Sequence, residues 1–481
     1  MKDNFRYVKK EDRKKILLLC DDIRMHSGIA TMAREIVTGT AHHFNWLNVG
    51  AAINHPEAGR GIDISQEINN LTGIDDAWVR VLPNNGYGDA MQIRNLLAQE
   101  KPDAIFIFTD PRYWVWLFEI EREIRNQIPI HYLNIWDDLP APLYNKAYYE
   151  SCDLLMAISK QTKNINEMVL GESAKDKIIK YVPHGINDKY FFPIRQGHEN
   201  FELLQQFKKN MFGEKEIDFV VLFNSRNIRR KSPGDVILSY KLFCDMIGEE
   251  KSKRCALVMH TQAVDENGTD LYAVREALCD ESVNVYFSQD RLDTPQMNLL
   301  YNIADVGLLI TSNEGWGLSL TETMMAGRMI IANVTGGMQD QMRFTYDTED
   351  RWIDFTPDFP SNHRRTYSNH GEWAIPVYPS NISLVGSVPT PYIFDDRCRP
   401  EDVAYAIMKA YTMPKEERDE KGLKAREWVT SDESGMSARQ MCENVIDAME
   451  ESFEKFVPRA RFDLHKVADR PKKRITHKLL Y

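Results

Sequence analysis

The residues best suited to chemistry lie in one segment, Ser312–Gly327, which contains two glutamates, Glu314 and Glu322. It also contains Gly315 and Gly317, and glycine lets the backbone come close to a ligand. The first turn of a helix presents unpaired N–H groups to an anion, and a carboxylate one to two turns further on can accept hydrogen bonds from a vicinal diol such as a ribose. The segment therefore predicts a site for a ligand with anionic groups and hydroxyls.

The two glutamates could instead be the acid and base of a glycoside hydrolase. Eight helical residues rise by about 12 Å, whereas the paired carboxyl groups of hydrolases lie about 5 to 9.5 Å apart. The spacing fits two hydroxyl-binding groups on one extended ligand better than a hydrolytic pair.

The elements around this segment are those of a doubly wound α/β sheet. The segment follows an apolar run at 306–310 and precedes another at 329–332. It therefore joins a strand to a helix at the carboxyl edge of a sheet, where ligands of such folds bind. Further strands of this sheet are expected over 219–223, 256–260 and 283–287.

The first half of the chain opens in the same way. An apolar strand at 15–20 leads to a turn with Ser27 and Gly28, and residues 29–36 have helical spacing. Strand, glycine turn and helix begin a Rossmann unit. We therefore predict an α/β fold of two Rossmann-like domains. Further strands of the first domain are expected over 104–108, 130–135 and 154–158.

Changes of pattern predict the domain bounds. A polar stretch after Phe192-Pro193 separates an N-terminal domain, 1–195, from a second domain, 196–430, and a C-terminal helix and basic tail follow over 431–481. Residues about 346–391 are rich in aromatic residues, proline and charge. They predict an insertion or long loop near the site.

Composition limits the class of protein. The chain has 481 residues, 43% of them hydrophobic, which is enough for two globular domains. Its seven cysteines are scattered without a C-x-x-C pair, as in proteins of a reducing compartment. We expect no transmembrane segment and no secretory signal, hence a cytoplasmic protein.

The net charge of −11 disfavours nucleic acid as a general partner. The end of the chain is basic, however, since residues 457–481 hold eight lysines and arginines against two aspartates. Such a tail could contact phosphates or anionic lipid, or could simply be a solvated arm.

The segment with the two glutamates resembles the E-x7-E signature of the retaining family-4 glycosyltransferases. These enzymes have the GT-B fold, in which two Rossmann-like domains face each other across a cleft. We therefore expect the first domain to bind the acceptor and the second to bind the nucleotide sugar. The resemblance implies that Glu314 contacts hydroxyls of the donor sugar and that Glu322 contacts the ribose of the nucleotide. The following residues, 330–337, resemble the next strand and glycine turn of the family.

Three more segments resemble the family in the same order, so that the resemblance covers about residues 15–430. Arg226 and Lys231 take the positions of its pyrophosphate-binding pair. A diphosphate leaving group gains negative charge as the sugar bond breaks, and two fixed cations stabilise that charge. Residues 181–193 are similar to its P-N-G-[IV]-D…F-x-P segment, and 304–312 resemble the strand before its glutamates.

The chain also departs from the family. Ser27 stands where the family often has glycine, so only Gly28 is assigned to the donor. Trp136, beside Asp137, replaces a histidine near the C6 oxygen of the sugar, which would suit a donor without C6, a pentose such as arabinose. Trp136 and Asp137 could contact the sugar or the acceptor. His184 replaces an asparagine and could contact phosphate or sugar, or have a structural role.

The resemblance implies that the donor is a nucleotide sugar, with a UDP-sugar as the first expectation, and that no cofactor and no metal is required. The aspartate pairs 21–22, 137–138 and 395–396 are then helix caps or turn residues. The expected catalytic residues are Arg226, Lys231 and Glu314. The expected donor-binding residues are Gly28, Arg226, Lys231, Glu314, Gly315, Trp316, Gly317, Leu318 and Glu322.

Other residues have two readings each. The aromatic run 113–118 could be an acceptor platform or a packed helix face. Residues 363–365 and Arg343 could bind an anionic acceptor or be solvated charge. Arg229 and Arg230 flank the proposed phosphate pair and are held as secondary.

Two classes of acceptor stay open. One is a hydroxyl of a surface polysaccharide or a lipid-linked glycan. The other is a hydroxymethylated cytosine in DNA, as for bacteriophage-encoded glycosyltransferases, which would act in the host cytoplasm and flip the base. The basic tail and the insertion favour DNA, and the acidic chain opposes it. A non-catalytic protein that binds a sugar nucleotide is the alternative from another class.

Overall fold

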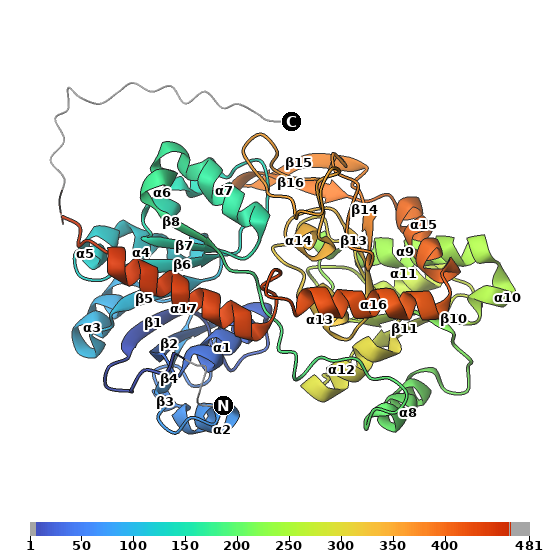
Figure 1. Cartoon of the computed structure of the whole chain (residues 1–481), viewed down its shortest axis with the longest axis horizontal. Coiled ribbons are helices and arrows are strands. Elements are labelled where there is room, and N and C mark those ends of the chain that lie inside the picture. Colours follow the sequence, from blue (N-terminus) through green and yellow to red (C-terminus); the bar gives the residue numbers. More distant parts are fainter. Residues whose placement is uncertain (1–5, 461, 463–481) are drawn as a thin grey trace. The chain divides into compact units, whose positions relative to one another are not determined.

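The chain folds around two largely parallel sheets, which the computed structural model describes over residues 6–460 and residue 462 (Figure 1). Contacts divide the chain into two units. The first contains the chain up to Pro183, Ser387–Pro391 and the part from Ala438 onward. The second contains His184–Gly386 and Tyr392–Ser437. Each unit is an α/β unit, as the sequence predicts.

The bounds of the units differ from the predicted domain bounds of 1–195, 196–430 and 431–481. Residues 184–195 lie in the second unit, and the helix α17 (Ala438–Lys455) lies in the first. The assignment of the acceptor to the first domain and of the donor to the second remains a prediction. Most of the basic tail lies outside the described residues.

The sheet of the first unit has the strand order β3-β4-β2-β1-β5-β6-β7-β8. All neighbours are parallel except β3, which is antiparallel to β4. The central strands are continuous apolar runs because helices cover both faces. The strands are β1 (Lys14–Asp21), β2 (Phe44–Ala52), β3 (Ile62–Asp63), β4 (Val79–Asn85), β5 (Ala104–Phe108), β6 (Ile130–Asn134), β7 (Leu154–Ala157) and β8 (Ile178–Tyr181).

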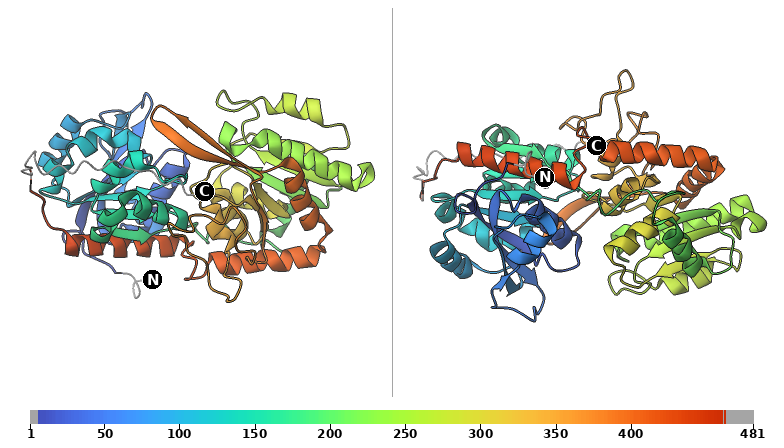
Figure 2. Two further views of the ribbon diagram at one scale, coloured as in Figure 1. Left: turned by 90° about the horizontal axis from the view of Figure 1, so that it is seen from above. Right: turned by 60° about the horizontal axis from the view of Figure 1, so that its bottom comes forward.

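Helix α17 packs along α1 (Gly28–Thr40), at the other end of the chain (Figure 2). The two helices approach each other so closely that a Cβ at Gly39 would collide with the Sγ of Cys442. The remaining helices of this unit are α2 (Ser65–Thr72), α3 (Ala90–Glu100), α4 (Val115–Glu119), α5 (Glu121–Arg125), α6 (Lys146–Glu150) and α7 (Lys160–Leu170), with 3₁₀ turns at Pro111–Trp114, Leu143–Asn145 and Gly171–Asp176.

The sheet of the second unit has the order β11-β10-β9-β12-β13-β14 and is parallel throughout. The order changes direction between β9 and β12, so the loops after these two strands lie at a topological switch point, where ligands of such sheets bind. The strands are β9 (Phe219–Asn224), β10 (Cys255–His260), β11 (Val285–Ser288), β12 (Val306–Leu309), β13 (Met329–Asn333) and β14 (Ala374–Val377).

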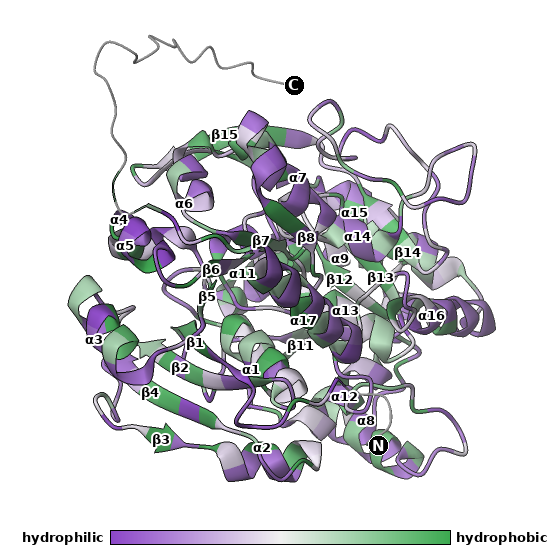
Figure 3. Ribbon diagram, turned by 60° about the vertical axis from the view of Figure 1, so that its left-hand side comes forward, coloured by the Kyte–Doolittle hydropathy of each residue, from purple (hydrophilic) through white to green (hydrophobic). Residues whose placement is uncertain are grey.

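The helices of the second unit include α15, which packs on α9, and α16, which is largely hydrophilic (Figure 3). A 3₁₀ turn at Arg229–Lys231 precedes α9. The helices are α8 (Phe201–Phe212), α9 (Pro233–Ile247), α10 (Glu249–Ser252), α11 (Leu271–Leu278), α12 (Thr294–Ile303), α13 (Leu318–Met325), α14 (Met338–Met342), α15 (Pro400–Thr412) and α16 (Lys415–Val429).

The segment predicted as an insertion, about 346–391, is only partly irregular. Its later part forms the edge strand β14 and most of a hairpin of β15 (Asn381–Ser387) and β16 (Thr390–Arg397). Pro376 lies within β14. An edge strand tolerates proline because its outer side forms no ladder. Because proline argues against a strand, the sequence did not predict this one.

Within the described part of the chain, no helix combines the length and apolar character needed to cross a bilayer. The seven cysteines are free.

We predict that Gly39→Ala destabilises the first unit by about 1 to 2 kcal/mol, because overpacking against Cys442 outweighs the better helix propensity of alanine. Thermal unfolding measures the effect, and adding Cys442→Ala should recover part of the loss. Gly234→Ala in α9 is the matched control, since a Cβ there meets open space. An unchanged melting temperature for Gly39→Ala would contradict the packing argument.

Candidate functional site

Two loops meet at the carboxyl edge of the second sheet, one after β9 and one after β12. The backbone N–H of Ser312 and the hydroxyl of Thr311 donate to the carbonyl oxygen of Arg230, at 2.8 and 3.0 Å. The guanidinium of Arg230 donates to the carbonyl oxygen of Asn313 at 2.5 Å. These bonds hold the 3₁₀ turn that carries Lys231 against the turn that carries Glu314.

Glu314 lies between two cations. The Nζ of Lys231 donates to its Oε2, and an Nη of Arg230 lies 3.4 Å from the same oxygen. The Lys231 and Glu314 side chains are only 11% and 12% exposed. Burial favours the neutral form of Glu314, but Lys231 and Arg230 outweigh it and lower the pKa of this carboxyl below its ordinary value. Glu314 is therefore ionised at neutral pH.

The turn between Glu314 and α13 is shaped by a glycine and a buried tryptophan. Gly317 has a left-handed φ of +89°, which lets the chain enter α13 at Leu318. The buried indole of Trp316 donates to Thr321 at 3.0 Å. The buried side chain of Trp316 thus fixes the turn to α13. A contact between residues 315–318 and a ligand would come from backbone N–H groups at the start of the helix.

A second glycine turn packs directly on the first. The N–H of Gly337 donates to the carbonyl oxygen of Glu314 at 3.0 Å. A Cβ at Gly336 or Gly337 would collide with the carbonyl oxygens of Glu314 or Gly315. The two glycines after β13 are therefore required by contact between two backbones.

Glu322 lies on α13 and is half-buried. It accepts a hydrogen bond from the hydroxyl of Tyr301 on α12, and the amide of Asn224 at the end of β9 donates to that hydroxyl at 2.6 Å. Burial raises the pKa of Glu322 to about 7, although the bond from Tyr301 opposes the shift. Sequence analysis missed Tyr301, because a tyrosine in an apolar helix carries no signal of its partner.

Arg226 lies elsewhere on the loop after β9. Its guanidinium forms an ion pair with Asp265 at 3.0 Å, and its side chain is 64% exposed. The sequence assigns Arg230 only a secondary role, but it is Arg230, and not Arg226, that lies beside Glu314. The role of Arg226 with a pyrophosphate stays a prediction.

His184, the first residue of the second unit, is buried beside Trp316, and the two rings meet edge to face with centroids 6.3 Å apart. Burial lowers the pKa of His184 to about 3, so the ring is neutral. This position fits a structural role, and a contact with phosphate or sugar stays a prediction.

The predicted residues of the first unit lie at the carboxyl ends of its strands. Gly28 begins α1, where the Ser27 hydroxyl accepts from the N–H of Ala30 at 3.0 Å. Trp136, just after β6, is buried, and its indole donates to the carbonyl oxygen of Asp138 at 3.1 Å. The carbonyl oxygen of Asp137 accepts from Gln161 at 2.6 Å. Their contacts with sugar or acceptor remain predictions.

Strand β16 holds both turns of the second-unit site. The hydroxyl of Ser312 donates to Asp395 at 3.0 Å, and that of Thr335 donates to Asp396 at 2.7 Å. Burial raises the pKa of Asp396 to about 7. This pair of aspartates, predicted as a cap or turn, fastens the hairpin to the site. Among the described residues no three His, Cys, Asp or Glu side chains cluster as metal ligands.

The other candidates have structural partners. Arg343 forms ion pairs with Asp350 at 2.6 Å and Glu433 at 3.6 Å. In the aromatic run 113–118, Tyr113 is half-exposed and its ring stacks on Tyr87, with centroids 4.3 Å apart.

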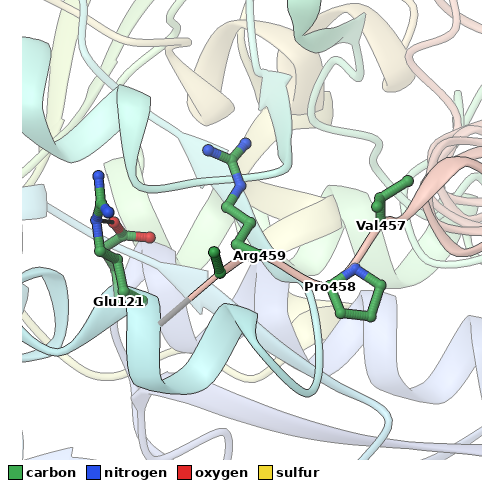
Figure 4. A pocket seen from close by; sticks show the side chains of 6 residues that line it. Glu121, Val457, Pro458 and Arg459 are labelled. Atoms are coloured by element: carbon green, nitrogen blue, oxygen red, sulfur yellow. Dashed lines mark ion pairs between the residues drawn. The ribbon is translucent and has the colours of Figure 1, made fainter. Parts of the chain in front are cut away.

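A pocket of about 390 Å³ lies in the first unit, and none of the predicted site residues lines it (Figure 4). Its lining residues are Glu121, Arg122, Val457, Pro458, Arg459 and Ala460.

No family model and no curated protein matches the chain. Solved structures do match. Sucrose-phosphate synthase from Thermosynechococcus elongatus has a TM-score of 0.61 at 15% identity, over 92% of this chain and 100% of that chain. A glycosyltransferase from Rickettsia africae has a TM-score of 0.60 at 13% identity, over 92% and 100%. HepE from Anabaena, in complex with UDP and glucose, has a TM-score of 0.58 at 12% identity, over 91% and 100%.

At these identities the likeness shows the fold. The chain therefore has the GT-B fold of two Rossmann-like domains, and this prediction from the sequence is confirmed.

Proposed function

We propose that the chain is a retaining glycosyltransferase, which binds a nucleotide-activated sugar at the carboxyl edge of the second sheet. The observation that carries the proposal is the cluster of Lys231 and Arg230 on Glu314 at the start of α13, with Glu322 on the same helix. Cations suit a diphosphate, and carboxylates suit hydroxyls. HepE, which shares the fold, has been crystallised with UDP-glucose, which supports UDP-sugar as the donor.

Each residue of the cluster has its own role in the proposed reaction. Lys231 and Arg230 bind the diphosphate and stabilise the charge that its outer phosphate gains as the sugar leaves. Glu314, ionised, accepts hydrogen bonds from the sugar hydroxyls and orients the ring. Glu322 accepts hydrogen bonds from the ribose.

The transfer needs no enzymic nucleophile in this proposal. The bond from the sugar C1 to the phosphate oxygen breaks while the bond from C1 to the acceptor oxygen forms on the same face. The proton of the acceptor hydroxyl moves to the leaving phosphate oxygen. Configuration is retained, and the products are the glycosylated acceptor and a nucleoside diphosphate.

The proposal also extends to which sugar is transferred and to which class of acceptor. A pentose donor rests on Trp136, and its alternative is a hexose such as glucose. A DNA acceptor rests on the basic tail, most of which lies outside the described residues, and on the insertion. Arg343, just before the insertion, is held in ion pairs. A glycan acceptor is the alternative. Mass spectrometry of hydroxymethylated DNA and of glycan pools, each incubated with UDP-hexoses and UDP-pentoses, tests both parts at once.

Lys231→Ala should lower kcat by about 10²- to 10³-fold, because one fixed charge of the leaving-group site is lost. Release of UDP from the donor is the measurement. Arg229→Ala is the matched control, since it removes an exposed arginine from the same turn and should leave the rate near that of the wild type. Equal rates for Lys231→Ala and the wild type would refute the role of Lys231.

Glu322→Ala should weaken UDP binding by about 10- to 150-fold, the contribution of hydrogen bonds to a charged group. Isothermal titration calorimetry measures it. An unchanged affinity would remove Glu322 from the nucleotide site.

The affinity of the wild type for UDP should rise with pH through about 7. The pKa of Glu322 is raised to about 7 by burial, so this carboxyl is protonated below that pH, and the ionised form is the better acceptor for two hydroxyls. Titrations at pH 6 and pH 8 are compared with those of Glu322→Gln, which reveals the part due to titration of UDP itself. An identical pH dependence in both proteins would contradict the assignment.

A further inference from the structure

The proposed role of Glu322 requires its carboxyl to keep one orientation. A glutamate side chain has several rotatable bonds, and fixing it costs conformational entropy that weakens binding unless the side chain is already fixed. The hydroxyl of Tyr301 engages the Oε2 of Glu322. This bond joins α12 to α13.

The direction of the proton in this bond follows from its other partner. The amide Nδ2 of Asn224 can only donate, and it lies 2.6 Å from the phenolic oxygen of Tyr301. The phenolic oxygen accepts there, so its own hydrogen is available for Glu322. Burial and the nearby Glu322 raise the pKa of Tyr301 well above its ordinary value, so the phenol keeps this hydrogen at every physiological pH.

Tyr301 is itself held rigidly. Its side chain is fully buried, and its ring meets that of Phe191 edge to face, with centroids 5.8 Å apart. The helix α12 begins with a capping box of Asp293 and Gln296. Near its end Asn302 donates to the carbonyl oxygen of Phe192 at 2.9 Å. The hydroxyl is thus placed by packing and by a helix fixed at both ends.

We infer that Tyr301 is a positioning residue: held by Asn224, it fixes the Glu322 carboxylate for the ribose hydroxyls and so makes the site select ribonucleotides over 2′-deoxyribonucleotides. The inference rests on the proposed function. Asn224, Tyr301 and Glu322 form one chain of hydrogen bonds. This chain links the end of β9, which precedes the proposed phosphate-binding loop, to the glutamate proposed to bind the ribose. Tyr301 contacts Glu322 and acts through it.

Calorimetry with UDP and 2′-deoxy-UDP tests the inference on the full chain. The proteins are the wild type, Tyr301→Phe, Glu322→Ala and the double variant. The matched control is Tyr286→Phe, a tyrosine of β11 in the same unit whose hydroxyl makes no hydrogen bond among the described residues. Thermal unfolding confirms that each variant is folded, and Asn224→Ala, which removes the amide that orients the phenol, is a second variant.

Tyr301→Phe should weaken UDP binding by about 3- to 10-fold and 2′-deoxy-UDP binding by less, because 2′-deoxy-UDP offers Glu322 only its 3′-hydroxyl, so that the preference for the ribonucleotide falls. It should have no further effect in the Glu322→Ala background, because coupled residues are not additive. Asn224→Ala should lower the preference in the same direction, and Tyr286→Phe should not change it.

An unchanged preference in Tyr301→Phe, with a reduced one in Glu322→Ala, would overturn the inference and leave the proposed function standing. Equal effects of Tyr301→Phe on both nucleotides would also overturn it, since a general structural role predicts that result. A wild type that binds neither UDP nor another nucleoside diphosphate would instead overturn the proposed function.

Discussion

An ionised glutamate lies almost buried in the second unit, and the two cations beside it are what make this possible. A buried carboxylate without a partner costs several kcal/mol. Lys231 and Arg230 offset that cost at Glu314, but only because the loop after β9 lies against the turn after β12. The strand order makes these two loops neighbours, and Gly336 and Gly337 let the turn after β13 pack on the backbone of Glu314 and Gly315.

The two carboxylates of α13 and its turn differ in environment. Cations lower the pKa of Glu314, while burial raises that of Glu322 to about 7. Opposite shifts are also typical of an acid and a base in a hydrolase. The cations distinguish the two cases, because Lys231 and Arg230 would weaken Glu314 as a base or nucleophile, whereas a diphosphate needs them.

Much of the fold could be predicted from the sequence, since buried parallel strands are apolar runs and the turns between them contain glycine. The spacing of the glutamates pointed to Glu314 and the family resemblance pointed to Lys231, and the structure brings these two residues together. Side-chain partners were not. Arg226 pairs with Asp265 on another loop, and Tyr301 reaches Glu322 from another helix. The strand β14 was hidden by its proline, and the place of α17 in the first unit depends on contacts with residues some 400 positions away, such as that of Cys442 with Glu35.

A crystal structure of the chain with UDP would show whether the diphosphate binds at this cluster. We expect a diphosphate oxygen within about 3 Å of the Nζ of Lys231 and of the guanidinium of Arg230, with the ribose hydroxyls on Glu322. A nucleotide bound away from the turn that carries Glu314, with Lys231 and Arg230 still paired to this glutamate, would contradict it.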